Sequence, residues 1–170
     1  MELNKNLVFI GMMGSGKTTI GKIVSKKLNK GFIDIDQQIE LEEKMTITDI
    51  FQKKGELFFR EIEEKISLHN LKKSNLVVSL GGGAFINKKI QKEVLKNHIS
   101  IWLKWDNNSL IKRIKNSSKR PIAIKLDNFG LDKLINERSK TYSKAKYQIR
   151  CDRLTKLEIT KKIIEFNDKG

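Results

Sequence analysis

The segment GMMGSGKTT, residues 11–19, constrains the fold of this chain more than any other part of its sequence. It follows the apolar run LVFI and precedes a helical pattern. Its glycines at positions 11 and 16, followed by Lys17 and Thr18, match G-x-x-x-x-G-K-[ST], a glycine-rich loop between a strand and a helix. The N–H groups of such a loop and the positive end of the helix bind nucleotide phosphates. We therefore expect ATP or GTP to bind here, with Lys17 on the transferring phosphoryl group and the Thr18 hydroxyl on Mg²⁺.

Strand and helix signals alternate along the rest of the 170-residue chain, without repeats or linkers. This alternation is typical of an α/β fold in which helices cover both faces of a parallel sheet. Asp106 is expected to N-cap one helix, and Thr155 with Glu158 fits a capping box for the last. The polar stretch 116–128 fits no element and is expected to be a mobile lid loop over the site. The expected strands are 7–10, 32–35, 76–80, 99–103 and 147–151. The expected helices are 17–29, 47–54, 57–72, 88–97, 109–115, 131–144 and 156–167.

The composition predicts one cytoplasmic domain over residues 1–170. No run approaches the ~20 apolar residues of a membrane span, and the N-terminus lacks the pattern of a signal peptide. The one cysteine, Cys151, allows no intrachain disulfide and no cysteine-based metal site. We interpret it as a buried, inert thiol.

The formal net charge of +15 raises a nucleic-acid hypothesis. Lysines, however, are spread over nearly every expected helix with glutamates between them, and no aromatic and basic platform is present. We interpret them as a solvated surface and expect no specific nucleic-acid partner. Only six of the 35 Lys and Arg residues are Arg, the side chain suited to bidentate binding of planar anions. Each is a candidate anion clamp: Arg60, Arg113, Arg120, Arg138, Arg150 and Arg153.

Two aspartates, Asp34 and Asp36, stand at the end of the expected strand 32–35, so we expect their side chains to point the same way. The carboxyl end of this strand opens on the same sheet edge as the phosphate loop. One carboxylate can hold a water molecule of the Mg²⁺ shell, and the other can accept a proton from an attacking hydroxyl. The pair therefore indicates chemistry beside the phosphate loop.

Two further motifs indicate a site for a small acceptor. Arg60 stands three residues before Glu63 on an expected helix, so Glu63 can hold the guanidinium in one orientation. A later strand ends in Gly81, Gly82 and Gly83. Three glycines there give exposed backbone N–H groups and room for a small ligand.

Together these segments resemble the shikimate kinase family. The matching segments are GMMGSGKTT, FIDIDQQIE, IFQKKGELFFREIE, SLGGGA, the Arg-Pro pair at 120–121 and ERSKTYSKA. They occur in family order between about residues 7 and 149. The resemblance implies a P-loop NTPase fold of three α/β/α layers, with a five-stranded parallel sheet like that of nucleoside-monophosphate kinases. It also implies ATP-dependent phosphorylation of shikimate to 3-phosphoshikimate, on the route to chorismate and the aromatic amino acids. The expected partners are ATP, shikimate and one Mg²⁺ ion bound with ATP, with no membrane and a monomeric state.

The resemblance implies a role for each matching residue. Asp36 is implied to be the catalytic base, assisted by Lys17 and by Arg120 from the lid loop. Thr18 and Asp34 are implied to serve the metal site. ATP is implied to be bound by Gly14, Ser15, Gly16, Lys17, Thr18, Thr19, Arg113 against the adenine, and Arg120. Shikimate is implied to be bound by Asp36, Arg60, Glu63, Gly81, Gly82, Gly83 and Arg138, with the arginines on its carboxylate.

Two departures and two alternatives remain. Ile122-Ala123 stands where the family often has Leu-Leu, and residues 152–156 lack an expected proline, which leaves the adenine contacts there open. Arg153 is a candidate to make the adenine contact in place of that proline. A related kinase for another polyol acid, such as gluconate, predicts a different acceptor motif. A noncatalytic nucleotide- or RNA-binding module predicts salt-sensitive RNA binding and no ATP turnover with shikimate.

Overall fold

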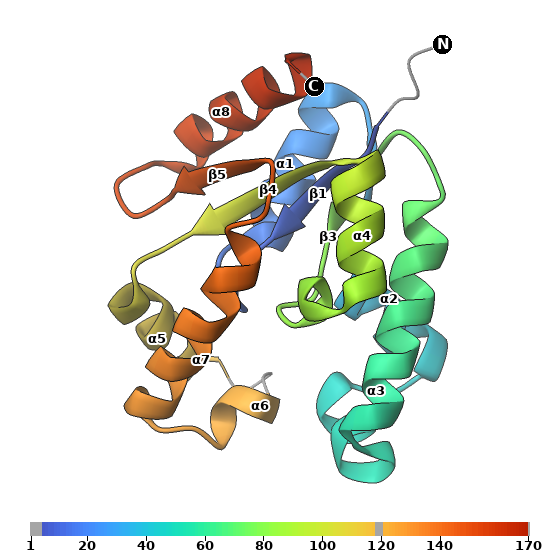
Figure 1. Ribbon diagram of the computed structural model, residues 1–170, viewed down its shortest axis with the longest axis vertical. Helices are drawn as coiled ribbons and strands as arrows, with labels where there is room; N and C mark the ends of the chain where they lie inside the picture. Colours follow the sequence, from blue (N-terminus) through green and yellow to red (C-terminus); the bar gives the residue numbers. More distant parts are fainter. Residues whose placement is uncertain (1–4, 118–120, 170) are drawn as a thin grey trace.

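The computed structural model describes residues 5–117 and 121–169. Five parallel strands form one sheet in the order β2-β3-β1-β4-β5 (Figure 1). The strands are β1 (Leu7–Ile10), β2 (Gly31–Asp34), β3 (Leu76–Ser79), β4 (Ile99–Lys104) and β5 (Tyr147–Arg150). The helices are α1 (Lys17–Leu28), α2 (Ile35–Glu43), α3 (Ile47–Leu71), α4 (Lys88–Asn97), α5 (Asn107–Lys115), α6 (Pro121–Ile124), α7 (Asn128–Tyr142) and α8 (Lys156–Asp168), with a 3₁₀ turn η1 (Ala84–Ile86).

Alternating strand side chains divide the core into two apolar clusters, one on each face of the sheet. In β1, Leu7 and Phe9 pack in one cluster with residues of α1 and α8. Val8 and Ile10 pack in the other with residues of α3, α4 and α7. The three layers confirm the α/β/α fold with a five-stranded parallel sheet (Figure 1).

The sheet brings the sequence motifs together at one edge. β1 lies in the middle of the sheet and is completely buried, so the loop that follows it leaves from the centre of the carboxyl edge. Next to β1, β3 ends just before the glycine segment 81–83, and β2, on the far side of β3, ends at Asp34. Ligands of open parallel sheets bind at this edge.

One prediction near this edge was wrong. From the expected strand 32–35, the sequence predicted that Asp36 continues the strand alternation and points the same way as Asp34, and it did not predict α2. In the structure the strand ends at Asp34, whose carboxylate accepts a 3.2 Å hydrogen bond from the Gln37 N–H and so N-caps α2. Asp36 therefore lies in the first turn of a helix, and strand alternation does not relate the two side chains.

The structure also changes the expected boundaries around two other segments. Gly55, the expected helix stop, has φ 86° and ψ 169° and interrupts α3 between its two expected parts. The stretch 116–128, expected to be a loop, contains α6. α7 begins earlier than expected, at Asn128, because Asp127 accepts a hydrogen bond from the Gly130 N–H. Arg120 lies outside the described residues.

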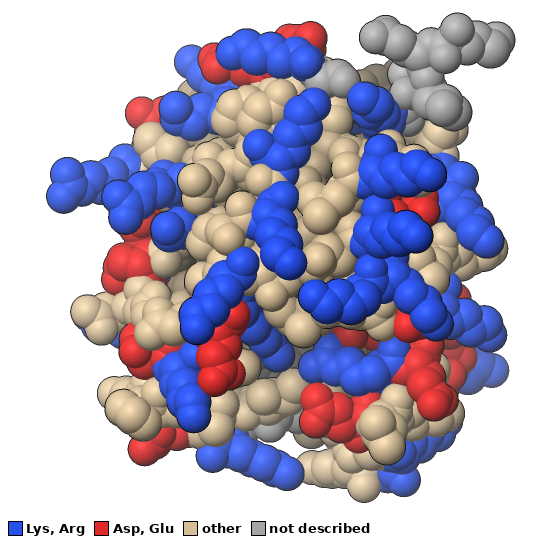
Figure 2. Space-filling model, viewed as in Figure 1, with Lys and Arg blue, Asp and Glu red and all other residues tan. Residues whose placement is uncertain are grey.

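The two predicted helix caps and the burial of Cys151 were confirmed. Asp106 caps α5, and Thr155 with Glu158 forms a capping box on α8. Cys151 is buried, and burial raises the pKa of its thiol to about 12, which keeps it protonated and inert at neutral pH. On the face shown in Figure 2, Lys and Arg side chains extend over several elements with Asp and Glu between them. Within the described part of the chain, no helix is both long and apolar enough to cross a membrane.

Candidate active site

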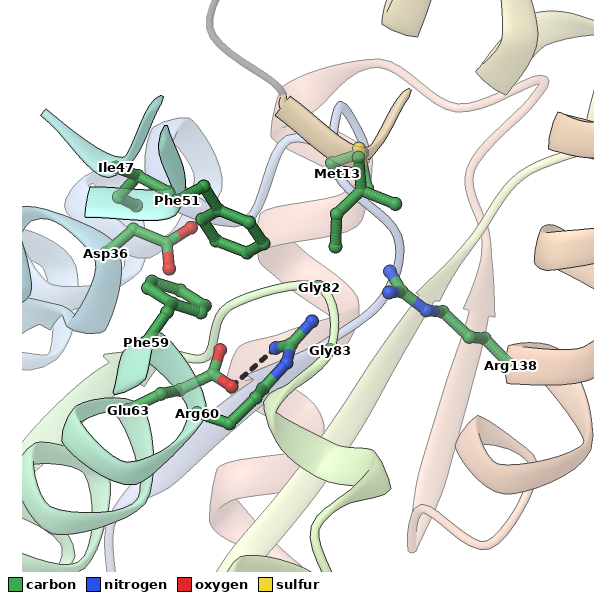
Figure 3. A pocket seen from close by; sticks show the side chains of 11 residues that line it. Met13, Asp36, Ile47, Phe51, Phe59, Arg60, Glu63, Gly82, Gly83 and Arg138 are labelled. Carbon is green, nitrogen blue, oxygen red and sulfur yellow. Dashed lines mark hydrogen bonds and ion pairs between the residues drawn. The ribbon is translucent and has the colours of Figure 1, made fainter. Parts of the chain in front are cut away.

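Two adjoining pockets lie at the carboxyl edge of the sheet. The arginine pocket (Figure 3) is lined by Met13, Asp36, Ile47, Phe51, Phe59, Arg60, Glu63, Gly82, Gly83, Ile122 and Arg138. The phosphate-loop pocket is lined by Met13, Gly14, Gly16, Lys17, Thr18, Thr19, Asp34, Asp36, Ser79, Leu80, Gly82 and Arg113. Met13, Asp36 and Gly82 line both pockets, so a molecule in one can meet a molecule in the other.

The phosphate loop has the conformation that its glycines allow. Gly14 and Gly16 have φ values of 80° and 90°, and α1 begins at Lys17 directly after the loop. The Lys17 ammonium donates hydrogen bonds to the carbonyls of Gly11 (2.8 Å) and Met12 (2.9 Å). The lysine therefore folds back over the loop and carries its charge at the wall of the phosphate-loop pocket.

Thr18 and Asp34, the expected metal pair, lie together in this pocket. The Thr18 hydroxyl donates a short hydrogen bond to Asp34 Oδ2. A hydroxyl and a carboxylate are the oxygen ligands that Mg²⁺ takes beside water and phosphate. The described residues contain no group of three or more His, Cys, Asp or Glu that could hold a metal. The Thr18 hydroxyl and the Asp34 carboxylate therefore fit a Mg²⁺ ion as two of its oxygen partners.

Two arginines face the arginine pocket from different helices. Arg60 of α3 donates a 2.6 Å charged hydrogen bond to Glu63, as the i,i+3 spacing predicted. Glu63 is 2% exposed, and burial raises the pKa of its carboxyl group against the opposing effect of Arg60. Arg138 extends from α7 on the other side of the pocket (Figure 3) and is also buried. Two positive groups thus converge on one small hollow, the geometry of an anion clamp.

Two of the three glycines, Gly81 and Gly83, make room for these side chains. A Cβ on Gly81 would lie 2.7 Å from oxygens of both Asp36 and Glu63. A Cβ on Gly83 would lie 2.5 Å from the guanidinium of Arg60. A methyl group at either position would push a polar side chain out of place. Close packing against the site is therefore the physical reason for glycine here.

Asp36 lies at the junction of the two pockets. Burial of its carboxyl group raises its pKa to about 7, with further increases from the negative charges of Asp34 and Glu63. The positive charges of Lys17 and Arg60 lower it in part. A carboxyl group with a pKa near 7 is divided between its acid and base forms at neutral pH, which suits proton transfer.

The raised pKa predicts that stability decreases with pH. Because folded Asp36 binds its proton more tightly than the unfolded chain does, the free energy of unfolding should fall between about pH 4 and pH 7, and stay lowered above it. Asp36→Asn should abolish this part of the decrease and stabilise the protein at pH 8 by roughly 1–4 kcal/mol. Urea unfolding of both proteins at pH 4 and pH 8 measures these free energies of unfolding. Asp168→Asn, an exposed aspartate near the C-terminus, is the control and should change neither value.

Two expected site residues lie outside both pockets, and two residues close to the site were not predicted. Ser15 and Gly81 line neither pocket, although Gly81 packs against two side chains that do. The sequence did not predict a role for Tyr142, whose hydroxyl donates a short hydrogen bond to the Gly82 carbonyl. Its position four residues after Arg138 on one helix face was the available signal. It also missed Trp105, whose indole contacts the phosphate loop.

Comparison with known proteins identifies the family. The family model described as shikimate kinase matches residues 13–168. A shikimate kinase of Sulfurihydrogenibium sp. is 40% identical over 160 residues, which cover 94% of this chain and 96% of that protein. A shikimate kinase structure from Acinetobacter baumannii, in complex with shikimate, superposes with a TM-score of 0.91 at 27% identity, covering 97% of this chain and 93% of that one.

A deoxyadenosine kinase of M. mycoides has the same fold, with a TM-score of 0.65 at 15% identity, covering 97% of this chain and all of that one. This likeness concerns the fold alone. The family match extends over most of the chain and includes the phosphate loop from Met13 onward, the arginine pocket and the residue between them. The chain belongs to the shikimate kinase family.

Proposed function

We propose that the protein transfers the γ-phosphoryl group of ATP to a hydroxyl of shikimate, giving 3-phosphoshikimate and ADP. The observation that carries this proposal is the position of Asp36, which lines both the phosphate-loop pocket and the arginine pocket. A base at this junction can serve an acceptor in one pocket and a donor in the other. Family membership supports the identity of both substrates.

The arginine pocket selects and orients the acceptor. Its two guanidinium groups, on Arg60 and Arg138, bind the carboxylate, and Glu63 holds Arg60 in its orientation. Phe51, Phe59 and Ile47 provide apolar walls for a carbon ring. A rigid hydroxy acid held in this way presents a hydroxyl to Asp36.

The transfer step follows from this arrangement. Asp36 accepts the hydroxyl proton while the acceptor oxygen forms a bond to the γ-phosphorus and the bond to the oxygen between the β- and γ-phosphorus breaks. Lys17 and the loop N–H groups neutralise the charge on the phosphoryl group. Thr18 and Asp34 would hold the one Mg²⁺ ion, which supplies further charge neutralisation when bound with ATP. Arg113 would lie against the adenine, and Arg120 would bind the phosphates of ATP. We also propose that the protein acts as a monomer in the cytoplasm.

A panel of hydroxy acids tests the proposal. Shikimate, gluconate and the methyl ester of shikimate are each incubated with ATP and Mg²⁺, and ADP formation is measured. We expect rapid turnover with shikimate alone. Preference for gluconate would favour the related sugar-acid kinase, and salt-sensitive RNA binding without turnover would favour the noncatalytic module.

Replacing each clamp arginine by lysine separates charge from geometry. Arg60→Lys and Arg138→Lys keep the positive charge but lose the planar fork. A hydrogen bond to a charged group contributes about 1.5–3 kcal/mol, so losing one should raise the acceptor KM by about 10- to 150-fold. Glu63→Gln should show a milder increase, because the guanidinium stays but is less firmly held. Steady-state kinetics with shikimate measure these changes.

Three observations check that the effect belongs to the clamp. ATP affinity without acceptor should barely move in either variant. Arg150→Lys, an exposed arginine at the end of β5, should behave as wild type. The clamp variants should also discriminate less between shikimate and its methyl ester. Equal phosphorylation of acid and ester by wild type would disprove the clamp.

A further inference from the structure

The side chain of Trp105 contacts the phosphate loop from outside its motif. Trp105 follows β4, which pairs with β1 beside the loop. Its Nε1–H group donates a 2.9 Å hydrogen bond to the Ser15 carbonyl. The ring also packs against the apolar clusters on both faces of the sheet. The indole therefore connects the phosphate loop to the rigid core.

Arg113 of α5 stacks on the same indole. The central carbon of its guanidinium lies 3.7 Å from the centroid of the Trp105 ring, a distance typical of cation–π stacking. One of its nitrogens donates a 3.3 Å hydrogen bond to the Gly14 carbonyl. Arg113 lines the phosphate-loop pocket and Trp105 does not. The indole thus supports the guanidinium without itself lining the pocket.

The hydrogen bond from Trp105 has a consequence for the next peptide group. In a trans peptide the carbonyl and the following N–H point in opposite directions. Holding the Ser15 carbonyl toward Trp105 therefore directs the Gly16 N–H to the opposite side. Gly16 lines the phosphate-loop pocket, whereas Ser15 does not. Glycine restrains its own backbone least of all residues, so an external hydrogen bond matters most here.

We propose that Trp105 is a positioning residue for the nucleotide. It aims the Gly16 N–H at a phosphate, and it supports Arg113 in a place where the guanidinium meets the base. The inference rests on the nucleotide half of the proposed function. Because the contacts act on Gly14, Ser15 and Arg113, which do not line the arginine pocket, acceptor binding should not depend on them.

Two variants and two ligands separate these roles. Trp105→Phe keeps a ring under Arg113 but loses the N–H donor, and Trp105→Leu loses both. Calorimetry with ADP should show binding about 2- to 12-fold weaker in Trp105→Phe, the loss of one neutral hydrogen bond. Trp105→Leu should be weaker by about a further 2- to 5-fold, the loss of the stacking contact. With inorganic triphosphate, which has no base, the two variants should show the same loss.

The controls exclude a general structural effect. The acceptor KM at saturating ATP should stay within about 2-fold of wild type in both variants. Trp102→Phe removes the other indole of the same segment, which is 5% exposed and packs on Tyr142, and should leave ADP affinity unchanged. If Trp105→Leu does not fold, Trp105→Phe still decides whether the hydrogen bond to Ser15 positions the loop for the phosphates.

Two results would overturn the inference. One is equal ADP affinity in wild type and the Trp105 variants. The other is a parallel loss of ADP and acceptor affinity with a lower Tm, which would make the residue merely structural. A wild-type protein that binds neither ADP nor triphosphate would instead refute the proposed function.

Discussion

Asp36→Asn is expected to lower the rate of phosphoryl transfer by about 10²- to 10⁴-fold. The amide keeps the shape of the side chain and a hydrogen-bonding group, but it cannot accept the proton of the attacking hydroxyl. With a pKa of about 7, wild-type Asp36 should also make the rate rise with pH through the neutral range, as the carboxyl group becomes ionised. The variant should lose this part of the pH dependence.

Single-turnover rates and shikimate affinity must be measured separately, because Asp36 also binds the acceptor in this proposal. Phosphoryl transfer is loose and electrostatic, which leaves room for an effect at the low end of the range. Glu42→Gln changes an exposed carboxylate on the same helix and should leave the rate unchanged. A loss confined to affinity, with a normal single-turnover rate, would reduce Asp36 to a binding residue.

Lys17→Ala is expected to lower phosphoryl transfer by about 10³-fold or more, comparable to the loss of other charged groups that stabilise the transferring phosphoryl group. The ammonium is held by the Gly11 and Met12 carbonyls at the wall of the phosphate-loop pocket. Its removal takes the lysine charge away from the wall of the phosphate-loop pocket, whereas the arginine pocket is unchanged. The fall should therefore appear in kcat, with the acceptor KM little affected.

Circular dichroism and the Tm of this variant show whether the fold survives. Lys26→Ala, an exposed lysine in the last turn of the same helix, is the matched control and should retain full activity. Near-normal turnover in Lys17→Ala would refute the assignment of the phosphate loop.

The sequence predicted most elements because their signals are local. The glycine-rich loop, the Gly55 interruption and the caps at Asp106 and Thr155 depend on a few neighbouring residues. The missed helix α2 shows the limit of this reasoning. Asp34 both ends a strand and caps a helix. The two-residue spacing of Asp34 and Asp36 is equally compatible with a strand that continues to Asp36.

The candidate site was likewise predicted from the sequence only in part. The sequence by itself determined the phosphate loop and the pairing of Arg60 with Glu63, since both rest on the geometry of one continuous segment. Only the tertiary structure decided that Arg138 faces Arg60 across a pocket, that the pKa of Asp36 rises to about 7, and that Trp105 supports Ser15 from 90 residues away. These features depend on how helices and strands pack, and burial and distance between segments are properties of the folded chain that residue spacing does not contain.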